Sequence, residues 1–476
     1  MTQVLSVVSE CAPLVKTGGL ADVAGALPIA LEQEGVRMRT LMPLYPQVKS
    51  RTKGARKVLS FDDLMGGPAR VLAAKVEGLD LLLLDAPHLY DREGSIYLGP
   101  DGRDWPDNAE RFAALGRAAA VIAADGVGGW RPDVLHGHDW QAGLMTEYLH
   151  QMGLSDKVGT VMTIHNMAFH GLAPAEKIGT LGLDPERFTS DGYEFWGQIA
   201  ALKAGLINAD KLTTVSPTYA EELMTEHFGF GLDGVMRYRR DDLVGILNGI
   251  DDTTWDPKTD INIPPYKTPR GKKRAKAALQ KEFGLPESNG PLCVVVSRLT
   301  EQKGLDLLLA AMPTLTARGG QLALLGSGDA GLEQAYRELA SHDNVGVRIG
   351  YDETLSHRLI AGGDAILVPS RFEPCGLTQL YGLRYGTIPC VALTGGLADT
   401  VINASPAALA AKVATGVQFS PITTEALRNA INRLCDLYQD AATWEKMQKN
   451  AMAQPVGWGP SAAKYAALYK DVLALK

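Results

Sequence analysis

Short apolar segments alternate with longer amphipathic segments along this 476-residue chain, and this alternation limits the possible folds more than any other feature. In the first half, segments of strand length are repeatedly followed by segments of helix length. The expected strands are Val4–Ser9, Arg37–Met42, Leu79–Asp85, Val134–His136, Val158–Ile164, Leu212–Ser216 and Leu243–Leu247, and the expected helices are Ala21–Glu34, Asn108–Ala124 and Gln141–Gln151. Such alternation predicts an α/β fold with a mainly parallel, doubly wound sheet.

The alternation stops and then restarts in the second half of the chain. Residues 256–270 hold four prolines and no periodic pattern, which is typical of a connection between domains. Beyond a basic helical segment at 272–283, strands are expected at Leu292–Ser297, Gln321–Leu325, Val345–Ile349, Ala365–Pro369 and Ile388–Ala392. A chain of this length also exceeds one ordinary hydrophobic core, so we expect two doubly wound domains with a ligand-binding cleft between them.

The bulk composition excludes several classes of protein. The net charge is −7 and hydrophobic residues make up 46% of the chain, so a general nucleic-acid binder is not expected. The N-terminus does not resemble a signal peptide, and no apolar stretch reaches the roughly 18 residues of a membrane span. Five widely spaced cysteines form no Cys-x-x-Cys pair, which predicts a reducing, cytoplasmic location. Nothing in the sequence predicts a particular oligomeric state.

The first segment with functional chemistry is Lys-Thr-Gly-Gly-Leu at 16–20, between the first strand and the first helix. Gly18 and Gly19 allow the backbone to approach a ligand, and the free amides at a helix start favour an anion. Lys16 adds a compact positive charge suited to phosphate. A tight turn with a solvated lysine is an equally good interpretation of this segment alone.

A second basic segment follows the first strand of the second domain. Arg298 and Lys303 lie on one strand-to-helix loop, where two cations suit a diphosphate whose charge grows as it leaves. Two solvated surface cations are the alternative.

A third segment, at 370–378, follows a later strand of the same domain. Its turn exposes backbone amides, and Glu373 can accept hydrogen bonds from sugar hydroxyls. The simpler interpretation is a helix start capped by Thr378. A glycine-bearing turn at 394–400 echoes the Lys16 segment.

Two histidine segments end strands of the first domain: His-Gly-His-Asp-Trp at 136–140 and Thr-Ile-His-Asn at 163–166. His136 and His138 share a strand face, but no third ligand accompanies them, so we expect no metal. A carboxylate and an imidazole that contact sugar hydroxyls fit Asp139 and these histidines better. For His136, a buried histidine with satisfied hydrogen bonds is the simpler interpretation.

One segment favours a different class of enzyme. Residues 326–331 match Gly-x-Gly-x-x-Gly between a strand and a helix, with Asp352 about 20 residues further on, as in NAD-dependent dehydrogenases. The match falls on the second strand of its domain, however, whereas the dinucleotide fingerprint opens a domain.

Taken together, these segments resemble the bacterial glycogen synthases that use ADP-glucose, a family shared with plant starch synthases. The similarity runs from Val4 to the last helix. It rests on the motifs at 16–20, 136–140 and 163–166, and on Leu-Asn-Gly-Ile-Asp at 247–251, Ser-Arg-Leu-Thr-x-Gln-Lys-Gly at 297–304, Pro-Ser-Arg-Phe-Glu-Pro-Cys-Gly-Leu-Thr-Gln at 369–379 and Thr-Gly-Gly-Leu-Ala-Asp-Thr-Val at 394–401.

The resemblance implies a GT-B fold. Its N-terminal domain would span residues 1–247 and bind the glucan acceptor and part of the donor, and its C-terminal domain, 248–457, would bind the nucleotide-sugar. A final helix, 458–476, would pack on the first domain. The implied reaction is the configuration-retaining transfer of glucose from ADP-glucose to the non-reducing end of an α-1,4-glucan, without metal or cofactor.

The resemblance also implies roles for residues that match the family motifs. Arg298 and Lys303 would bind the diphosphate and stabilise departing ADP. Glu373 would grip glucose hydroxyls, and the His165 carbonyl would face the anomeric carbon. The implied donor-binding residues are Lys16, Gly18, Gly19, Asp139, Asn248, Gly326, Tyr351 (on adenine), Cys375, Gly376, Leu377 and Thr378 (on a phosphate), and the possible sugar or acceptor contacts are Asp22, Tyr97 and Asn166.

The chain departs from the wider retaining GT-B pattern at one position. Many relatives carry a second Glu eight residues after the first, and here that residue is Tyr381, so the usual ribose contact is in doubt. Three alternatives remain open at this stage. They are another GT-B enzyme such as a UDP-sugar transferase or a phosphorylase, the dehydrogenase, and a catalytically inactive glucan-binding protein.

Overall fold

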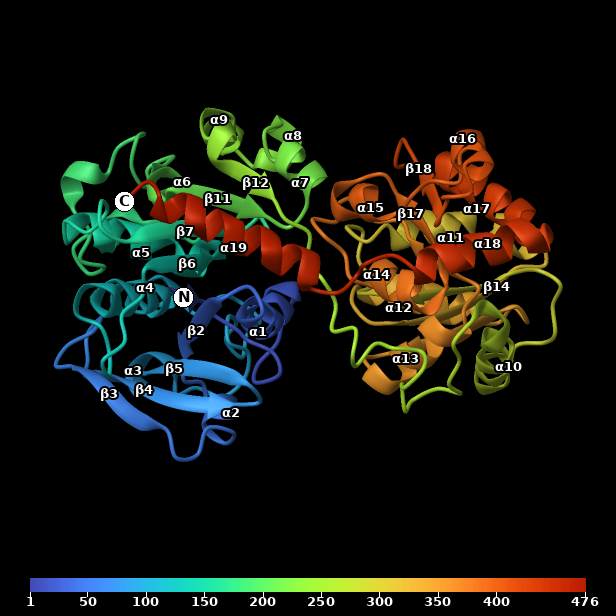
Figure 1. Cartoon of the computed structure of the whole chain (residues 1–476). Helices are drawn as coiled ribbons and strands as arrows, with labels where there is room; N and C mark the ends of the chain where they lie inside the picture. Colours follow the sequence, from blue (N-terminus) through green and yellow to red (C-terminus); the bar gives the residue numbers. More distant parts are fainter. The chain divides into compact units, whose positions relative to one another are not determined.

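Two large sheets dominate the computed structural model, which describes residues 1–476 (Figure 1). Contacts within the chain divide it into two compact units. Unit 1 contains Met1–Val215, Ala220–Ile246 and Trp458–Lys476, and unit 2 contains Ser216–Tyr219 and Leu247–Gly457.

Unit 1 is built on a nine-stranded sheet in the order β12-β11-β7-β6-β1-β2-β5-β4-β3. Its strands are parallel except around β4, which runs antiparallel to both β3 and β5. The strands are β1 Thr2–Val7, β2 Val36–Pro43, β3 Arg56–Phe61, β4 Ala69–Val76, β5 Leu79–Asp85, β6 Val134–His138, β7 Gly159–Ile164, β11 Lys211–Thr214 and β12 Leu243–Gly245.

A small antiparallel sheet, β8-β10-β9, is a separate part of unit 1. Its strands are β8 Leu172–Pro174, β9 Glu194–Phe195 and β10 Gln198–Ala200. The sequence prediction contains neither this sheet nor the β3–β4 hairpin. These strands are short or only partly buried, so they contain no continuous apolar run from which a strand could be predicted.

The helices of unit 1 pack closely where small residues meet. A side chain on Gly143 would lie only 1.9 Å from the carbonyl oxygen of Ala201, so α5 and α6 touch backbone to backbone. The helices are α1 Gly19–Glu32, α2 Pro46–Lys49, α3 Pro87–Tyr90, α4 Asn108–Asp125, α5 Asp139–Gln151, α6 Ala201–Asn208, α7 Pro217–Glu222 (whose residues up to Tyr219 belong to unit 2), α8 Glu226–Gly229, α9 Asp233–Tyr238 and α19 Gly459–Leu473, with 3-10 turns at Ala175–Lys177, Pro185–Arg187 and Arg240–Asp242.

The C-terminal helix α19 is part of the core of unit 1. Its residues Tyr465, Tyr469 and Val472 are buried against Val4 of β1 and Val134 of β6. Figure 1 shows this helix, in red, lying along the blue-green elements of the N-terminal half. Side chains of the first strand and of the last helix are therefore part of the same hydrophobic core.

Unit 2 contains a six-stranded, all-parallel sheet in the order β15-β14-β13-β16-β17-β18. Numbered within the unit, this order is 3-2-1-4-5-6, which is that of the dinucleotide-binding doubly wound sheet. The strands are β13 Leu292–Val296, β14 Gln321–Gly326, β15 Val345–Ile349, β16 Ala365–Val368, β17 Ile388–Ala392 and β18 Val417–Phe419.

Helices follow the strands of unit 2 as its topology requires. They are α10 Lys272–Phe283, α11 Leu305–Ala317, α12 Ala330–Leu339, α13 Glu353–Gly362, α14 Thr378–Tyr385, α15 Gly395–Thr400, α16 Pro406–Ala410, α17 Thr424–Gln439 and α18 Ala441–Met452, with a 3-10 turn at Pro269–Gly271. All five cysteines of the chain are buried and free of disulfides. None of the helices is both long and apolar enough to cross a bilayer.

Candidate active site

In each large sheet, the predicted functional residues follow the strands where the strand order reverses. In unit 1 the reversal lies between β1 and β6, and in unit 2 it lies between β13 and β16. Ligands of doubly wound sheets bind outside the carboxyl ends of the strands at this point. The segments containing Lys16 and Asp139 follow β1 and β6, and those containing Lys303 and Glu373 follow β13 and β16.

The Lys16 loop is supported by Glu10, a residue that the sequence interpretation missed. Glu10 is 3% exposed, and its carboxylate accepts hydrogen bonds from the backbone N–H of Thr17 and, at 2.7 Å, from the Thr17 hydroxyl. Burial raises the pKa of Glu10 above its ordinary value. Its position just after β1 was the available signal, since that end of the strand faces the ligand site.

The cation of the same loop has a partner within unit 1. Lys16 Nζ lies 2.7 Å from Asp22 Oδ1, and about half of the Lys16 side chain is exposed. The residue before α1, Gly18, is extended and supplies no side-chain cap to the first helical turn. The loop thus offers uncapped amides and an accessible lysine, as an anion-binding interpretation requires.

Asp139 holds the loop that follows β7. It opens α5 with a left-handed backbone conformation, φ +55°, and its Oδ1 accepts hydrogen bonds from the backbone N–H of His165 at 2.7 Å and of Asn166 at 3.3 Å. Burial raises the pKa of Asp139 to about 7, and nearby Glu10 acts in the same direction. The structure therefore brings together Asp139 and His165, which the sequence prediction assigned to the glucose pocket, and Asn166, which it gave as a possible sugar or acceptor contact.

Three histidines of unit 1, His136, His138 and His165, form a buried network of neutral rings. His138 Nδ1 lies 3.0 Å from His165 Nε2, and the rings of His136 and His138 stack at 4.2 Å. Burial lowers the pKa of His136 and of His165 to about 3, so both are uncharged near neutrality. No cluster of three or more His, Cys, Asp or Glu side chains is placed to hold a metal ion.

His136 has both ring nitrogens satisfied, which confirms the simpler interpretation of this residue. Nδ1 lies 2.7 Å from the hydroxyl of Tyr469 on α19, and Nε2 lies 2.6 Å from the Thr163 hydroxyl. The ring is fully buried. His136 therefore connects the C-terminal helix α19 to the sheet through hydrogen bonds.

Tyr469→Phe should lower the free energy of unfolding by about 1–3 kcal/mol, because it leaves Nδ1 of His136 buried without a partner. Urea denaturation of the full chain measures this change. Tyr238→Phe is the matched control, since the Tyr238 side chain is 87% exposed. Equal unfolding midpoints for the two variants would contradict the role given to His136.

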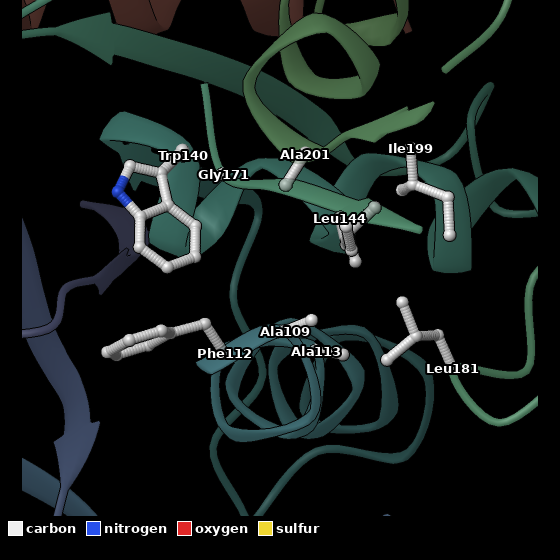
Figure 2. A pocket seen from close by; sticks show the side chains of 10 residues that line it. Ala109, Phe112, Ala113, Trp140, Leu144, Gly171, Leu181, Ile199 and Ala201 are labelled. Carbon is white, nitrogen blue, oxygen red and sulfur yellow. The ribbon is translucent and has the colours of Figure 1, made fainter. Parts of the chain in front are cut away.

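Tyr97 and Trp140 belong to an aromatic cluster beside an apolar pocket. The Tyr97 hydroxyl lies 2.7 Å from the hydroxyl of Ser9, and Phe112 packs on both aromatic rings. Figure 2 shows Phe112 and Trp140 at one end of a small pocket, with Leu181 and Ile199 at the other. Its lining side chains are mainly apolar, and Trp140 packs against Phe112 and Gly171.

In unit 2 the structure brings together Lys303 and Glu373, which lie 70 residues apart in sequence. Lys303 Nζ is 2.5 Å from Glu373 Oε2, and the Ser370 hydroxyl lies 3.0 Å from the same oxygen. Glu373 is 8% exposed. Arg371 pairs with Asp306 at 2.6 and 2.7 Å and thereby ties the Glu373 loop to the start of α11.

Arg298 differs from Lys303 in having no partner. Its side chain is exposed, and no hydrogen bond or ion pair engages its guanidinium. Unit 2 thus presents one unpaired arginine and one lysine beside a carboxylate at the same strand-order reversal. Two cations can bind an anion, and the carboxylate can accept hydrogen bonds from a neighbouring group that carries hydroxyls.

The segment after Glu373 departs from one interpretation made from sequence. The cap position of α14 is Leu377, and no side chain caps this helix, so Thr378 is not its cap. Gly376 has φ +72°, and Gln379 Nε2 donates to the carbonyls of Cys375 and Gly376 at 3.0 and 2.9 Å. The amides at the start of α14 consequently have no side-chain partner in the protein.

The glycine turn at 394–400 supports this segment directly. A side chain on Gly395 would lie 2.0 Å from the Glu373 carbonyl oxygen, and the N–H of Gly396 donates to that same oxygen at 3.1 Å. The glycines at 395 and 396, which resemble those of the Lys16 motif, are therefore explained by close packing against the backbone of Glu373.

Asn248 carries an unsatisfied polar atom in unit 2. The residue is 8% exposed, and its buried Oδ1 has no hydrogen-bond partner. An orphaned buried acceptor of this kind is rare in folded proteins.

The Gly-x-Gly-x-x-Gly match is explained by loop packing. Side chains on Gly326 and Gly328 would lie 2.0 and 2.4 Å from the carbonyl oxygens of Ser297 and Leu299, so these glycines let the loop after β14 pack on the Arg298 loop. Asp329 caps α12 by accepting from the Leu332 N–H at 3.0 Å.

Two tyrosines of unit 2 have contrasting environments. Tyr351 is 82% exposed, and its hydroxyl bonds to Glu353. Tyr381, which stands where many relatives carry a second Glu, stacks on Trp255 at 3.8 Å. The Tyr381 ring is therefore engaged in an aromatic stack within unit 2.

Two family models and several known proteins match the sequence of this chain. Residues 3–238 match the family described as starch synthase catalytic domain, and residues 278–453 match glycosyl transferases group 1. The chain is 65% identical to the glycogen synthase of Jannaschia sp. (strain CCS1), over 99% of both chains, and 62% identical to that of Paracoccus denitrificans (strain Pd 1222), over the full length of both. The chain belongs to the glycogen synthase family.

Solved structures agree on the fold. The catalytic domain of starch synthase IV from Arabidopsis thaliana, bound to ADP and acarbose, matches with a TM-score of 0.88 and 31% identity over 99% of both chains. Sucrose-phosphate synthase from Thermosynechococcus elongatus shares the fold, with a TM-score of 0.59 and 19% identity over the full length of both chains. The chain therefore has the expected GT-B fold and is a glucosyltransferase of glycogen synthesis.

Proposed function

We propose that this enzyme transfers glucose from ADP-glucose to the non-reducing end of an α-1,4-glucan with retention of configuration, and releases ADP. The observation that carries the proposal is the Lys303–Glu373 ion pair in unit 2, with the unpaired, exposed Arg298 on the same strand-to-helix loop as Lys303. Two cations can neutralise a departing diphosphate, while the carboxylate accepts hydrogen bonds from the sugar.

Other residues support the same donor. The uncapped amides at 376–378 and the uncapped start of α1 beside Lys16 suit phosphate oxygens or sugar hydroxyls. The orphaned Oδ1 of Asn248 fits a sugar hydroxyl that donates to it. Exposed Tyr351 offers a ring face to adenine, and Gly326 lies at the end of β14, packed against the Arg298 loop.

In the reaction that we propose, the acceptor attacks the face of the sugar from which ADP departs. The bond between the anomeric carbon and the phosphate oxygen breaks, the bond to the glucan 4-oxygen forms, and the 4-hydroxyl proton passes to the departing phosphate. Glu373 is held by Lys303 and Ser370, so it serves to orient the sugar rather than to attack it. Arg298 and Lys303 supply the positive charge, so the step needs no metal or cofactor.

The neutral state of His165 fits this scheme. Its imidazole is tied to His138 and its N–H to Asp139, so its backbone is fixed while its ring remains uncharged. We assign its carbonyl to the anomeric carbon, and Asp22, Tyr97 and Asn166 to contacts with the sugar or the acceptor. The five free cysteines support a reducing, cytoplasmic location.

Donor competition tests the proposal. The enzyme is incubated with glycogen and equal concentrations of ADP-glucose and UDP-glucose, and each released nucleotide is measured. ADP should be released in large excess over UDP. Preferential release of UDP would overturn the donor assignment, and release of neither would mean that neither nucleotide-sugar is the donor. A trapped covalent glucosyl adduct on a side chain would contradict the single-step transfer.

A further inference from the structure

Gln379 is fully buried in the first turn of α14. Its side-chain nitrogen Nε2 lies within hydrogen-bond distance of three oxygens, the carbonyls of Cys375 at 3.0 Å and Gly376 at 2.9 Å and the Thr400 hydroxyl at 3.2 Å. The Thr400 hydroxyl donates its own proton to the Gly396 carbonyl at 2.6 Å, so all three oxygens act as acceptors. These contacts fix the orientation of the amide group, with its NH2 toward the turn that precedes α14.

The oxygen of the same amide group has no partner. Oε1 of Gln379 is buried and makes no hydrogen bond. It faces Gly376, where a side chain would lie only 2.4 Å from it. An unsatisfied buried acceptor destabilises a folded protein, and such groups are rare. A leucine of similar size would avoid the unpaired oxygen, so the glutamine contributes its two N–H donors at this position.

The two carbonyls that Gln379 holds determine where the next two backbone N–H groups point. Both peptide bonds are trans, and a trans peptide is planar with its N–H directed opposite to its carbonyl. The N–H groups of Gly376 and Leu377 therefore point away from Gln379. Neither of them has a hydrogen-bond partner in the protein. They are two of the amides that the proposed function assigns to oxygens of the donor.

The Gln379 side chain is also connected to the backbone of Glu373. Thr400, which accepts from Gln379, donates to the carbonyl of Gly396, and the Gly396 N–H donates to the Glu373 carbonyl at 3.1 Å. Gly396 packs so closely that a side chain there would lie 2.1 Å from the Cys375 carbonyl oxygen. All of these residues belong to unit 2. One buried side chain thus links the unpaired amides to the carboxylate that we assign to the sugar hydroxyls.

We propose that Gln379 is a positioning residue for glucosyl transfer, which directs the N–H groups of Gly376 and Leu377 toward the donor and holds them in a fixed relation to Glu373. Hydrogen-bond donors accelerate a reaction when they are oriented in advance toward the group on which charge grows. Gln379 acts through these groups, because its own side chain is fully buried. The inference rests on the proposed function, since these amides affect turnover only if the donor binds to them.

Gln379→Leu tests this role, because leucine has a similar volume and no N–H donor. We expect kcat with ADP-glucose and glycogen to fall about a hundredfold, as for the loss of one oriented donor, while the KM for glycogen stays unchanged. Gln448→Leu is the matched control, because the buried Gln448 donates to the Gly386 carbonyl at 2.9 Å, at the other end of α14. Urea denaturation should show similar losses of stability in both variants, whereas only Gln379→Leu should lose activity.

Thr400 gives a second and milder test of the same network. Thr400→Val keeps the shape of the side chain but removes one acceptor of Gln379 and the bond to Gly396, so kcat should fall about tenfold, as for the loss of one hydrogen bond. Thr400→Ser keeps the hydroxyl and should retain most of the wild-type kcat. If kcat followed the unfolding midpoint in all four variants, Gln379 would serve stability alone and the proposal would be overturned.

A crystal structure of Gln379→Leu gives a measurement that does not depend on turnover. At least one of the carbonyls of Cys375 and Gly376 should turn away from residue 379, because a buried carbonyl without a donor is unfavourable. Unchanged directions of both peptide groups would overturn the proposal. If the wild-type chain released neither ADP nor UDP, the proposed function would fail, whereas rotated peptide groups in the variant would still support the control of these amides by Gln379.

Discussion

Replacing Lys303 or Arg298 with alanine is expected to lower kcat by about a hundredfold or more. Each side chain would stabilise charge that grows on the departing diphosphate, and removal of one such group from an enzyme costs about two to three orders of magnitude in rate. Steady-state kinetics with ADP-glucose and glycogen measure the loss. It should appear mainly in kcat, because the interaction strengthens in the transition state.

The two variants should differ in stability although both lose activity. Arg298 is exposed and unpaired, so its removal should change the free energy of unfolding by less than about 0.5 kcal/mol. Lys303→Ala leaves the buried Glu373 carboxylate without its cation and should cost about 1–3 kcal/mol. Arg318→Ala, which removes a partly exposed cation paired with Asp436, is the matched control for activity. Near-normal turnover in both site variants would exclude the proposed roles.

Local patterns in the sequence predicted most elements of both sheets. The segment after Asn108 forms α4 over almost the expected range, and the expected strand at 345–349 is β15. Such elements are encoded by a run of neighbouring residues, so one window of sequence reveals them. The β3–β4 hairpin was missed because its strands are half exposed and depend on pairing with β5.

The sequence predicted the motifs of the candidate site, but it did not predict which of their side chains contact one another. Lys303 and Glu373 were both singled out, yet only the order β13-β16 brings them within 2.5 Å. Glu10 was missed because a lone acidic residue after a strand has no pattern of its own. His136 meets Tyr469 across 333 positions, a contact that no local pattern encodes.

The Lys16 loop illustrates the same limit. Its glycines and lysine predicted an anion site, but the groups that fix its shape, Glu10 and Asp22, come from outside the Lys-Thr-Gly-Gly-Leu segment. Lys16 is accessible, while the neighbouring Thr17 is held by hydrogen bonds to the buried Glu10 carboxylate. This geometry favours a role in donor binding over a role in the chemical step.

Asp139→Asn should make the chain's stability less dependent on pH between about 5 and 8. Burial raises the pKa of Asp139 to about 7 in the folded state, against about 3.9 in an unfolded chain. Between these values the folded state keeps a proton that the unfolded state has lost, so the free energy of unfolding falls as the pH rises. Because an asparagine side chain cannot ionise, this fall of about 2 kcal/mol should disappear in the variant.

The difference in stability between the wild-type chain and Asp139→Asn reports the titration of Asp139 and not that of its neighbours. The raised pKa of Glu10 makes the wild-type stability fall with pH in the same direction, but that contribution is present in both proteins. His165 and His138 are uncharged in the folded state over this range and also contribute equally. Urea denaturation at pH 5, 6, 7 and 8 gives the difference between the two proteins, and Asp241→Asn, whose side chain is 99% exposed, should give a constant difference. A constant difference for Asp139→Asn as well would mean that Asp139 is ionised throughout this range, and burial would then not control its charge.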